Sequence, residues 1–583
     1  MRIVKLSAAI LAALFLSATA TAVTITQEGS GIAKDGEIKV KVVFEDGKIK
    51  NVDILKQQEN PVLSQKVFTD LKDEIVKTDS TYLDVIAGAT YSSLGLLAAV
   101  KDAAQKAGIT LKKVGKKSVK AQFAIPAERN YDVVVVGAGG AGFAAALTAK
   151  ALGVSVILLE KMPQVGGNSL ISGAEMNVAQ SWIQKELGIK DSPELHAQDT
   201  LKGGDYKGDP AVVETMTHGT LPAAGWLKNK YEPHNLFQFG GNSVKRALIP
   251  VGQTGTEYIT KLSALAQKEK IPVVTGMKAV ALVKNKDGRV VGVSCESNGK
   301  KYDFYAKGGI ILATGGFGAN AAMVKKYNPS LDERFKTTDA PGTTGEALYM
   351  AQKAGAELVN MQSIQTYPIC DPISGVIELI ADARFDGAIL INQEGKRFVE
   401  ELQRRDVISH AILNQPGSYC YVLWNDNIGK ISNTVKAHPE EYETFTKQGV
   451  MHTADNLKEV ADFFKIPYDN LKATVDRVSQ MAKDGGKDLD FHNRGGLKDL
   501  STGKYYIIKA VPSIHHTMGG VRINPKAEAL DKNGKPVPGL YAAGEVTGCT
   551  HGTNRLGGNA YTDIMVFGRI AGQQAAQAAQ AAK

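Results

Sequence analysis

The chain has 583 residues, enough for about three to four domains, and 43% of them are hydrophobic while 22% are charged. These values lie near the globular average and exclude a disordered, a collagen-like or a multispanning membrane protein. The formal net charge is +9, but the lysines are dispersed apart from a cluster in 112–120, so we expect a solvated linker there and no nucleic-acid binding. The 60 glycines gather beside apolar runs, as is typical of nucleotide-binding loops.

The first 22 residues form a predicted signal peptide. Arg2 and Lys5 precede an apolar run over 6–16, and small residues end the segment at Ala22. That run is too short to span a bilayer, so we expect a soluble mature protein in the periplasm after cleavage behind Ala22. The cysteines form no metal-binding or haem-attachment motif, so we expect no metal; they are Cys295, Cys370, Cys420 and Cys549.

The pattern in 23–111 predicts a small α+β domain. A strand over 37–44 turns at Asp46-Gly47 into a second strand over 49–54, and a helix over 92–107 ends before Gly108. Between them, the segment 84–92 reads Asp-Val-Ile-Ala-Gly-Ala-Thr-Tyr-Ser and offers the hydroxyl of Thr90 near a helix N-terminus.

This segment resembles the attachment site of FMN-binding domains, in which the flavin phosphate is esterified to the threonine of an S/T-G-A-T sequence. Ala87 occupies the first position, which is a departure from that pattern. The resemblance implies covalent FMN on Thr90, attached by a separate flavin transferase. The alternative is an ordinary glycine turn that caps the helix at Ser92 or Ser93.

A dinucleotide-binding fingerprint begins at residue 131. An apolar strand over 131–136 leads into a glycine-rich loop, a helix over 143–152 and a second strand over 154–159 that ends at Glu160. The pyrophosphate is expected at the helix N-terminus and the ribose hydroxyls at Glu160. NAD(P) and FAD both use this unit, whose loop residues are Gly137, Gly139, Gly140, Ala141 and Gly142.

Later glycine-rich segments lie at 166–169, 310–318, 539–546 and 554–560. Together with the fingerprint they resemble the flavoprotein family of fumarate reductase and succinate dehydrogenase, over about 131–572. The resemblance implies non-covalent FAD extended between N- and C-terminal loops. It also implies further cofactor-binding residues, which are Gly167, Asn168, Ser169, Gly173, Thr314, Gly315, Gly316, Glu545, Gly557, Gly558 and Asn559.

We therefore expect a multidomain α/β and α+β fold, in which a Rossmann-like FAD domain is interrupted by a clamp domain. The predicted boundaries are 1–22 for the signal peptide, 23–111 for the FMN-binding domain, 112–130 for the basic linker, 131–363 and 516–583 for the two parts of the FAD domain, and 364–515 for the clamp.

Members of this family bind one substrate carboxylate with an arginine and a histidine. The matching residues here are Arg555 in Asn-Arg-Leu-Gly-Gly and His515 in 514–520, whereas His516 is assigned to structure. The family's proton donor is an arginine in a sequence like 400–406, where Arg405 directly precedes the aspartate. A guanidinium fork suits a carboxylate and stabilises developing negative charge. The alternative for His515 and His516 is that both are hydrogen-bonded residues of the core. The alternative for Arg405 is a surface ion pair.

Three positions depart from the fumarate reductase pattern. Tyr367 stands where those enzymes have a histidine for the second carboxylate. Ala381 replaces the proton-relay glutamate, beside Asp382, and Glu175 stands where glycine is usual. Two acids and a phenol would repel a second carboxylate and favour a ring with N–H donors. For Asp382 the alternative is an internal ion pair with Arg384.

These departures predict urocanate, an acrylate that carries an imidazole ring, as the substrate. We expect electrons to enter at FMN from a periplasmic or membrane-anchored donor such as a multihaem cytochrome, and to pass to FAD. Hydride transfer to the β-carbon and protonation of the α-carbon by Arg405 would give imidazolepropionate, as a terminal step of anaerobic respiration.

The alternatives are a reductase of fumarate or of another acrylate, such as cinnamate or methacrylate, and a non-catalytic carrier of two flavins. A neutral aromatic ring would gain nothing from the Asp382 carboxylate, whereas an imidazole would. A carrier needs no carboxylate clamp such as His515 and Arg555.

Overall fold

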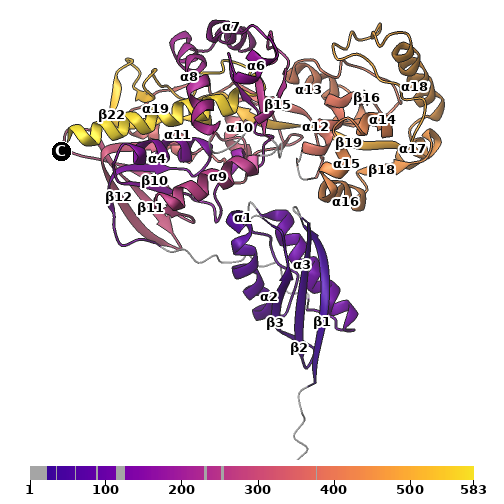
Figure 1. The fold of residues 1–583 in the computed structure, drawn as a ribbon, viewed down its shortest axis with the longest axis horizontal. Coiled ribbons are helices and arrows are strands. Elements are labelled where there is room, and N and C mark those ends of the chain that lie inside the picture. Colours follow the sequence, from indigo (N-terminus) through magenta and orange to yellow (C-terminus); the bar gives the residue numbers. More distant parts are fainter. Residues whose placement is uncertain are drawn as a thin grey trace, which may run out of the picture.

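The computed structural model describes residues 23–33, 36–59, 61–86, 89–112, 125–228, 233–250, 255–373, 375 and 377–582. The predicted signal peptide, most of the basic linker and the pair Ala87-Gly88 lie outside the described residues, as does the side chain of Thr90. In the described part of the chain, buried side chains gather in three hydrophobic clusters, at 33–104, at 131–361 with 514–579, and at 367–510. They are the cores of what we call the N-terminal, central and clamp domains (Figure 1).

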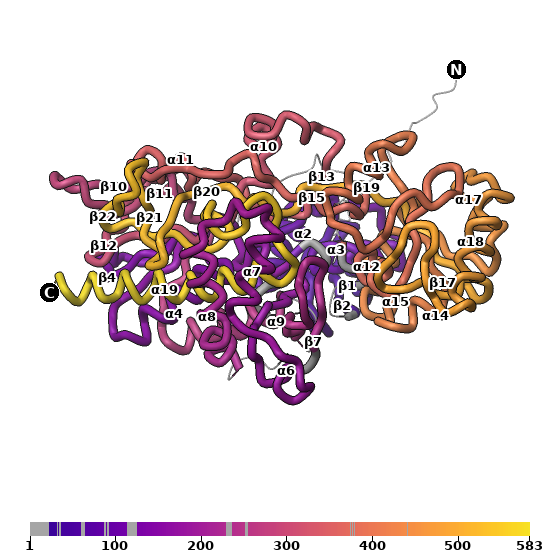
Figure 2. The backbone as a smooth tube through the Cα atoms, turned by 90° about the horizontal axis from the view of Figure 1, so that it is seen from above, coloured from indigo at the N-terminus to yellow at the C-terminus, as the bar shows by residue number. Residues whose placement is uncertain are grey.

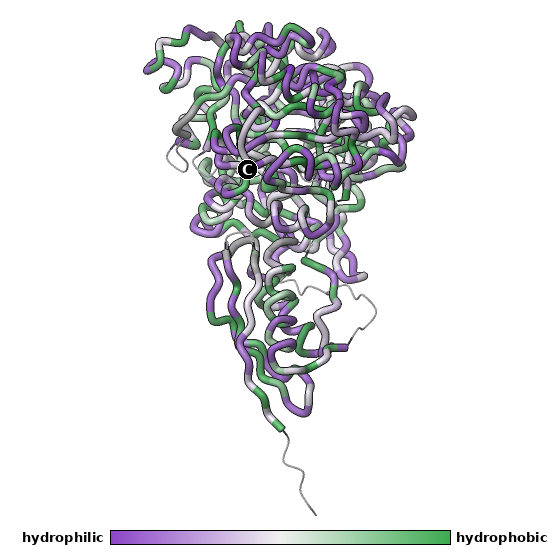
Figure 3. Tube along the Cα trace, turned by 90° about the vertical axis from the view of Figure 1, so that its right-hand side faces the viewer, coloured by the Kyte–Doolittle hydropathy of each residue, from purple (hydrophilic) through white to green (hydrophobic). Residues whose placement is uncertain are grey.

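The N-terminal domain is an antiparallel sheet covered by one long helix, and it projects away from the other two domains (Figure 3). The turn at Asp46-Gly47 joins the second and third strands, which confirms the predicted hairpin. A Cβ built at Gly29 would lie 2.1 Å from the carbonyl oxygen of Ala99, so glycine is what lets the helix approach the first strand. Its elements are β1 (Thr24–Ala33), β2 (Gly36–Glu45), β3 (Lys48–Lys56), α1 (Pro61–Lys66), η1 (Val67–Leu71), α2 (Lys72–Thr78) and α3 (Thr90–Lys106).

The central domain is built on a sheet in which β9, β5, β4 and β12 run parallel, with β22 also parallel to β12. The predicted strand, glycine-rich loop, helix and second strand form β4, α4 and β5 in that order. The elements around them are β4 (Asn130–Val136), α4 (Gly140–Ala151), β5 (Val156–Leu159), α5 (Gly167–Leu170), β6 (Met176–Asn177), α6 (Trp182–Glu186), α7 (Pro193–Gly203), α8 (Pro210–Lys228), β7 (Pro233–Phe237), β8 (Ala247–Pro250), α9 (Gly255–Lys268) and β9 (Val273–Val274).

The rest of the central domain comes from the segments on either side of the clamp. Before it lie β10 (Lys278–Lys284), β11 (Val290–Ser297), β12 (Lys300–Leu312), α10 (Ala321–Tyr327), β13 (Lys336–Thr337), α11 (Glu346–Lys353) and β14 (Leu358–Val359). After it lie β20 (Gly520–Val521), β21 (Glu528–Leu530), β22 (Pro536–Ala542), η3 (Gly544–Val546) and α19 (Asn559–Ala581). The view from above shows α19 running alongside α4 and α8 (Figure 2).

Two antiparallel strands connect the clamp domain to the central domain. The chain enters the clamp along β15 and leaves it along β19. The first half of β19 pairs with β17 and β18, inside the clamp core, and its second half pairs with β15 and β13. The elements are β15 (Ile364–Cys370), α12 (Glu378–Asp386), β16 (Ile389–Ile391), α13 (Arg405–Leu413), η2 (Pro416–Ser418), β17 (Cys420–Asn425), α14 (Asp426–Gly429), α15 (Thr434–Ala437), α16 (Pro439–Lys447), β18 (Met451–Ala454), α17 (Leu457–Phe464), α18 (Tyr468–Lys483) and β19 (Tyr505–Thr517).

Two further features concern the helices and the cysteines of the described residues. No helix in these ranges has the length and apolar content that a membrane span requires. All four cysteines are buried and unpaired, and burial raises the pKa of their thiols.

The contact between α19 and α4 gives a stability prediction. A Cβ built at Gly572 would lie 2.2 Å from the carbonyl oxygen of Ala145, so we expect Gly572→Val to force the helices apart and to lower the free energy of unfolding by roughly 1–3 kcal/mol. Gly225→Ala is the control, because a Cβ at this exposed helical glycine meets nothing within 4 Å and should be neutral or stabilising. Thermal unfolding of the holoprotein measures both; an unchanged Tm for Gly572→Val would contradict this account of the packing.

Candidate active site

The strands β15 and β19 place Tyr367 and His515 against each other. Tyr367 stands opposite Ser513 in the antiparallel register, and its ring centroid lies 5.1 Å from that of His515. On the other side of β19, the hydroxyl Oγ1 of Thr338 lies 2.8 Å from Nδ1 of His515. When that hydroxyl donates to Nδ1, Nε2 carries the proton and can donate to a carboxylate oxygen.

Arg405 begins α13 and is tied to β15. Its Nη1 donates to Oε1 of Gln365 at 2.9 Å, and its guanidinium lies 4.9 Å from the ring centre of Tyr367. The amide of Gln365 in turn donates to the carbonyl oxygen of Arg555 at 2.8 Å. Gln365 thus joins both arginines. Sequence reasoning missed it, and its one signal is its place two residues before Tyr367, on the same face of the strand.

The neighbouring Arg404 has a different environment, although it is adjacent in the sequence. It is exposed, and it forms ion pairs with Asp205 of the central domain at 3.0 Å and with Asp406 at 3.0 Å. Exposed pairs of this kind contribute little stability. Of the two adjacent arginines, Arg405 is therefore the one that joins the other candidate site residues.

Burial and mutual repulsion govern the charges of the site. Burial and the nearby Arg405 lower the pKa of Arg555 to about 9, and Nε of Arg555 has no hydrogen-bond partner in the described ranges. Burial also lowers the pKa of Arg405. Burial and both arginines hold the pKa of His515 well below its usual value, so its imidazole is neutral at pH 7. The site thus combines two buried arginines with a neutral histidine.

Two acidic side chains belong to the same electrostatic environment. Burial raises the pKa of Glu175, whose charge interacts favourably with Arg405 and Arg555 and unfavourably with Asp382. Asp382 on α12 lies 3.0 Å from Nε2 of His438, measured from its Oδ2. The structure thus brings the two candidate acids into one electrostatic group with the arginines.

The alternative for Asp382, an internal ion pair with Arg384, is wrong. The guanidinium of Arg384 donates instead to the carbonyl oxygen of Glu401 at 3.0 Å and to the hydroxyl of Tyr367 at 3.2 Å. The side chain of Tyr367 is consequently fixed by Arg384. Since its hydroxyl oxygen accepts that bond, its O–H proton can be donated to another acceptor.

The predicted cofactor loops border a cradle that suits a dinucleotide. Cβ atoms built at Gly139 and Gly315 would meet no atom closer than 3.5 Å and 3.7 Å, and one at Gly167 would meet nothing within 4 Å. This open space lies beside the N-terminus of α4, whose first N–H groups have no partner inside the helix. Glu160 is buried at the end of β5, where it accepts hydrogen bonds from the backbone N–H groups of Ala138 and Met162. These residues fit FAD.

A buried polar cluster surrounds Asn168. Its Nδ2 donates to Asp339 at 2.9 Å and to Glu545 at 3.1 Å, and burial raises the pKa of both acids. His516 lies near this cluster, with Nδ1 3.8 Å from Oε1 of Glu545. Ser169 accepts a hydrogen bond from the backbone N–H of Gly140 at 3.1 Å, which ties its loop to the start of α4.

Several predicted cofactor residues have packing roles in this structure. Asn559 accepts from Asn177 at 2.7 Å and donates to Thr200 at 3.0 Å, so its side chain is engaged within the protein. A Cβ would meet an atom at 1.8 to 2.4 Å at six of the predicted glycines, which are Gly137, Gly142, Gly173, Gly316, Gly557 and Gly558. At Gly137 and Gly142 that atom is a backbone carbonyl oxygen, so close packing requires glycine at these two positions. Thr314 follows β12 and precedes Gly315 of the cradle.

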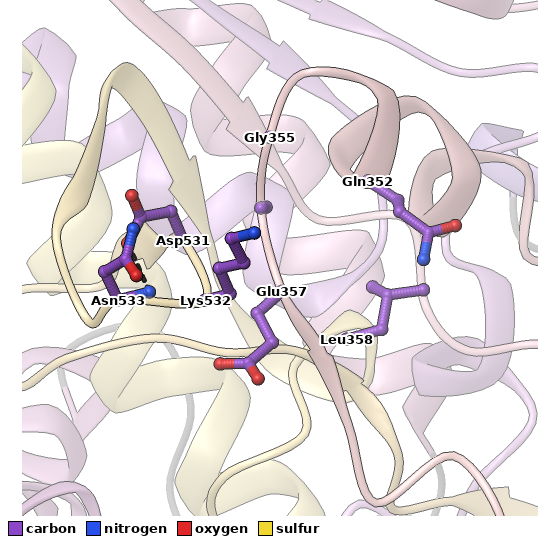
Figure 4. Close-up of a pocket in the computed structure, with 8 residues that line it drawn as sticks. Gln352, Gly355, Glu357, Leu358, Asp531, Lys532 and Asn533 are labelled. Atoms are coloured by element: carbon purple, nitrogen blue, oxygen red, sulfur yellow. Dashed lines mark hydrogen bonds between the residues drawn. The ribbon is translucent and has the colours of Figure 1, made fainter.

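A shallow pocket of about 450 Å³ lies elsewhere, between α11 and the turn that joins β21 to β22 (Figure 4). It is lined by Gln352, Gly355, Ala356, Glu357, Leu358, Asp531, Lys532 and Asn533. None of the candidate site residues reaches it, so we assign it no part in the chemistry. The described residues contain no group of three or more side chains able to hold a metal ion.

Comparison with known proteins agrees with this architecture. The family model of an FMN-binding domain matches 34–105, and that of a FAD binding domain matches 132–561. A urocanate reductase from Eggerthella lenta is 42% identical over 558 residues, which cover 94% of this chain and 91% of that protein. A cytochrome-type fumarate reductase from Shewanella frigidimarina is 40% identical over 449 residues, covering 76% of this chain and 77% of that protein.

Among solved structures, the open conformation of a flavocytochrome c3 fumarate reductase superimposes with a TM-score of 0.68 at 36% identity, covering 78% of this chain and 79% of that one. The chain therefore belongs to the fumarate reductase flavoprotein family, with an FMN-binding domain before its FAD-binding domain. It is an oxidoreductase that acts on a carbon–carbon double bond. The family and the fold class predicted from the sequence are confirmed.

The lowered pKa of Arg555 predicts an alkaline limit to substrate capture. Because neutral Arg555 no longer attracts a carboxylate, kcat/KM should fall above about pH 9, the range in which the free enzyme loses this proton. A bound carboxylate raises the pKa of Arg555, so the fall in kcat should come at higher pH. Steady-state rates with reduced viologen across this pH range measure the fall in kcat/KM and the fall in kcat. A kcat/KM that stays level beyond about pH 10 would contradict this account of Arg555.

Proposed function

We propose that this reductase converts urocanate into imidazolepropionate. The observation that supports this substrate most directly is the mixed charge of the site, where Glu175 is attracted by Arg405 and Arg555 and repelled by Asp382. A ligand that suits groups of both signs carries a carboxylate at one end and an N–H donor at the other. Urocanate has both groups, joined by the double bond that an enzyme of this family reduces.

The first role of the protein is to hold the substrate carboxylate. Arg555 supplies a guanidinium fork, and Nε2 of the neutral His515 supplies an N–H donor, provided that Thr338 donates to Nδ1. FAD, when bound, supplies the hydride that adds to the β-carbon. Negative charge then develops on the α-carbon and the carboxylate, where Arg555 and His515 stabilise it more strongly than in the ground state.

The second role is to deliver a proton. Arg405 is held by Gln365 beside Arg555, so an N–H of Arg405 is available to protonate the α-carbon. An ordinary arginine is a poor acid, but burial lowers the pKa of this one and brings it closer to a useful range. The hydrogen bond from Arg405 to Gln365 fixes the direction from which the proton is given.

The third role is selection of the far end of the substrate. The second carboxylate of fumarate would be repelled by Glu175 and Asp382, whereas an imidazole N–H can donate to Asp382. The O–H of Tyr367 can donate to the other ring nitrogen, because its oxygen is the acceptor in the hydrogen bond from Arg384. A cinnamate ring would leave both polar groups without a partner, which costs binding energy.

We further propose that the protein works in the periplasm as a respiratory enzyme. The basic and apolar N-terminal segment supports export. Thr90 is the first residue of α3, a position that favours a phosphate, and this supports covalent attachment of FMN by a flavin transferase. The resemblance to a cytochrome-type fumarate reductase supports a cytochrome as the electron donor.

Substrate choice is tested by the anaerobic oxidation of reduced viologen, with urocanate and fumarate offered in parallel. We expect turnover with urocanate and little with fumarate, and a 10- to 100-fold lower kcat/KM for urocanate in Asp382→Asn, as lost hydrogen bonds to a charged group imply. Asp455→Asn, at an exposed site of the clamp, is the matched control and should match the parent. Faster turnover with fumarate, or an Asp382→Asn variant that retains full activity on urocanate, would contradict the proposed substrate.

Covalent flavin is tested on protein made in a host that has a flavin transferase. We expect the denatured chain to keep its flavin fluorescence and to carry the added mass of one FMN less water, both absent from Thr90→Val. Thr69→Val is the control, because its hydroxyl is exposed on η1 of the same domain. Fluorescence that persists in denatured Thr90→Val would place the attachment at another residue.

A further inference from the structure

Asp382 has a partner that sequence reasoning missed. The carboxylate of Asp382 uses Oδ2 to contact Nε2 of His438, at 3.0 Å. Both side chains keep limited contact with solvent, at 26% exposure for Asp382 and 15% for His438. In the described part of the chain, Oδ1 of Asp382 has no hydrogen bond. One carboxylate oxygen is thus occupied and the other is available.

The backbone holds His438 firmly in this position. His438 ends α15 and precedes α16, with its N–H donating to the carbonyl oxygen of Thr434 at 3.2 Å. Its own carbonyl oxygen accepts from the N–H of Tyr442 at 3.1 Å. Pro439 follows directly and restricts the backbone further. The backbone from which the His438 imidazole extends is therefore held in place between α15 and α16.

The segment 432–441, which contains His438, is hydrogen-bonded to both ends of α12. Asp386, one turn after Asp382, accepts from the N–H of Ser432 at 3.0 Å and from its hydroxyl at 2.8 Å. At the other end, Oε2 of Glu441 accepts from the N–H of Leu379 at 2.9 Å. These hydrogen bonds hold the segment against α12, and His438 lies between Ser432 and Glu441 in the sequence. Its contact with Asp382 differs from theirs because Asp382 also interacts with Glu175 in the candidate site.

From this geometry we propose that His438 is a positioning residue for the substrate. By donating from Nε2 to Oδ2, it holds the Asp382 carboxylate so that Oδ1 accepts an N–H from the heteroaromatic ring of the substrate. The inference rests on the proposed function, and it deepens it by naming the residue that orients the ring-binding acid. Because His438 acts through Asp382, it contributes to substrate affinity. It contacts neither the carboxylate nor the double bond of the substrate.

The expected signature is a change in KM without a comparable change in kcat. In His438→Phe, which cannot donate, KM for urocanate should rise about tenfold while kcat stays within about twofold of the parent. His438→Gln keeps a side-chain N–H at a similar reach and should restore most of the affinity. The dissociation constant of imidazolepropionate, read from the absorbance of the oxidised flavin, should follow the same order and does not depend on turnover.

A double-mutant cycle separates positioning from general damage to the fold. In an Asp382→Ala background, His438→Phe should cause no further loss, because the group it orients is gone. His410→Phe, on the exposed face of α13 in the same domain, is the matched control and should behave as the parent.

The outcomes distinguish this inference from the proposed function. If the parent protein reduces urocanate and His438→Phe has an unchanged KM, or if the losses in the cycle are additive, His438 has no positioning role and the proposed substrate still holds. Equal losses in His438→Phe and His438→Gln would overturn the hydrogen bond as the cause. A parent protein that neither reduces urocanate nor binds imidazolepropionate overturns both.

Discussion

The buried guanidinium group of Arg555, next to that of Arg405, is the interaction on which the site depends. Neither arginine forms an ion pair in the described part of the chain. The charge of Arg405 disfavours that of Arg555, and the charge of Arg384 disfavours that of Arg405. A buried charge without a close counterion costs several kcal/mol, a cost that a bound anion offsets. We propose that the substrate carboxylate is this anion, and the same charges keep His515 neutral.

The fold brings these charges together from segments far apart in the chain. β15 carries Gln365 and Tyr367 into the clamp, and β19 returns from it with His515. The loop before α19 supplies Arg555, and the single amide of Gln365 reaches both this loop and Arg405. The residues that we propose for carboxylate binding, proton donation and selection of the far end are thus all linked to one pair of strands. The same pair connects the clamp to the central domain.

Local pattern predicted the parts of this molecule that are local. The strand, loop and helix around Gly137 and the hairpin at Asp46-Gly47 follow from spacing and motif, and the observed structure agrees with them. The role of Arg405 was assigned from its motif and stays a prediction. Gln365 and His438 were missed because their roles arise from contacts with residues distant in sequence. For the same reason the sequence left open the pairing of Asp382, and it gave no sign that the side chain of Asn559 would be engaged within the protein.

The central claim is that the two ends of the substrate are recognised by opposite charges. A crystal structure of the oxidised holoprotein with imidazolepropionate tests it most directly. The account predicts the carboxylate of the ligand on Arg555 and His515, its α-carbon beside Arg405, and its ring nitrogens against Asp382 and Tyr367. A ligand bound in the reverse direction, with its ring on Arg555, would contradict it.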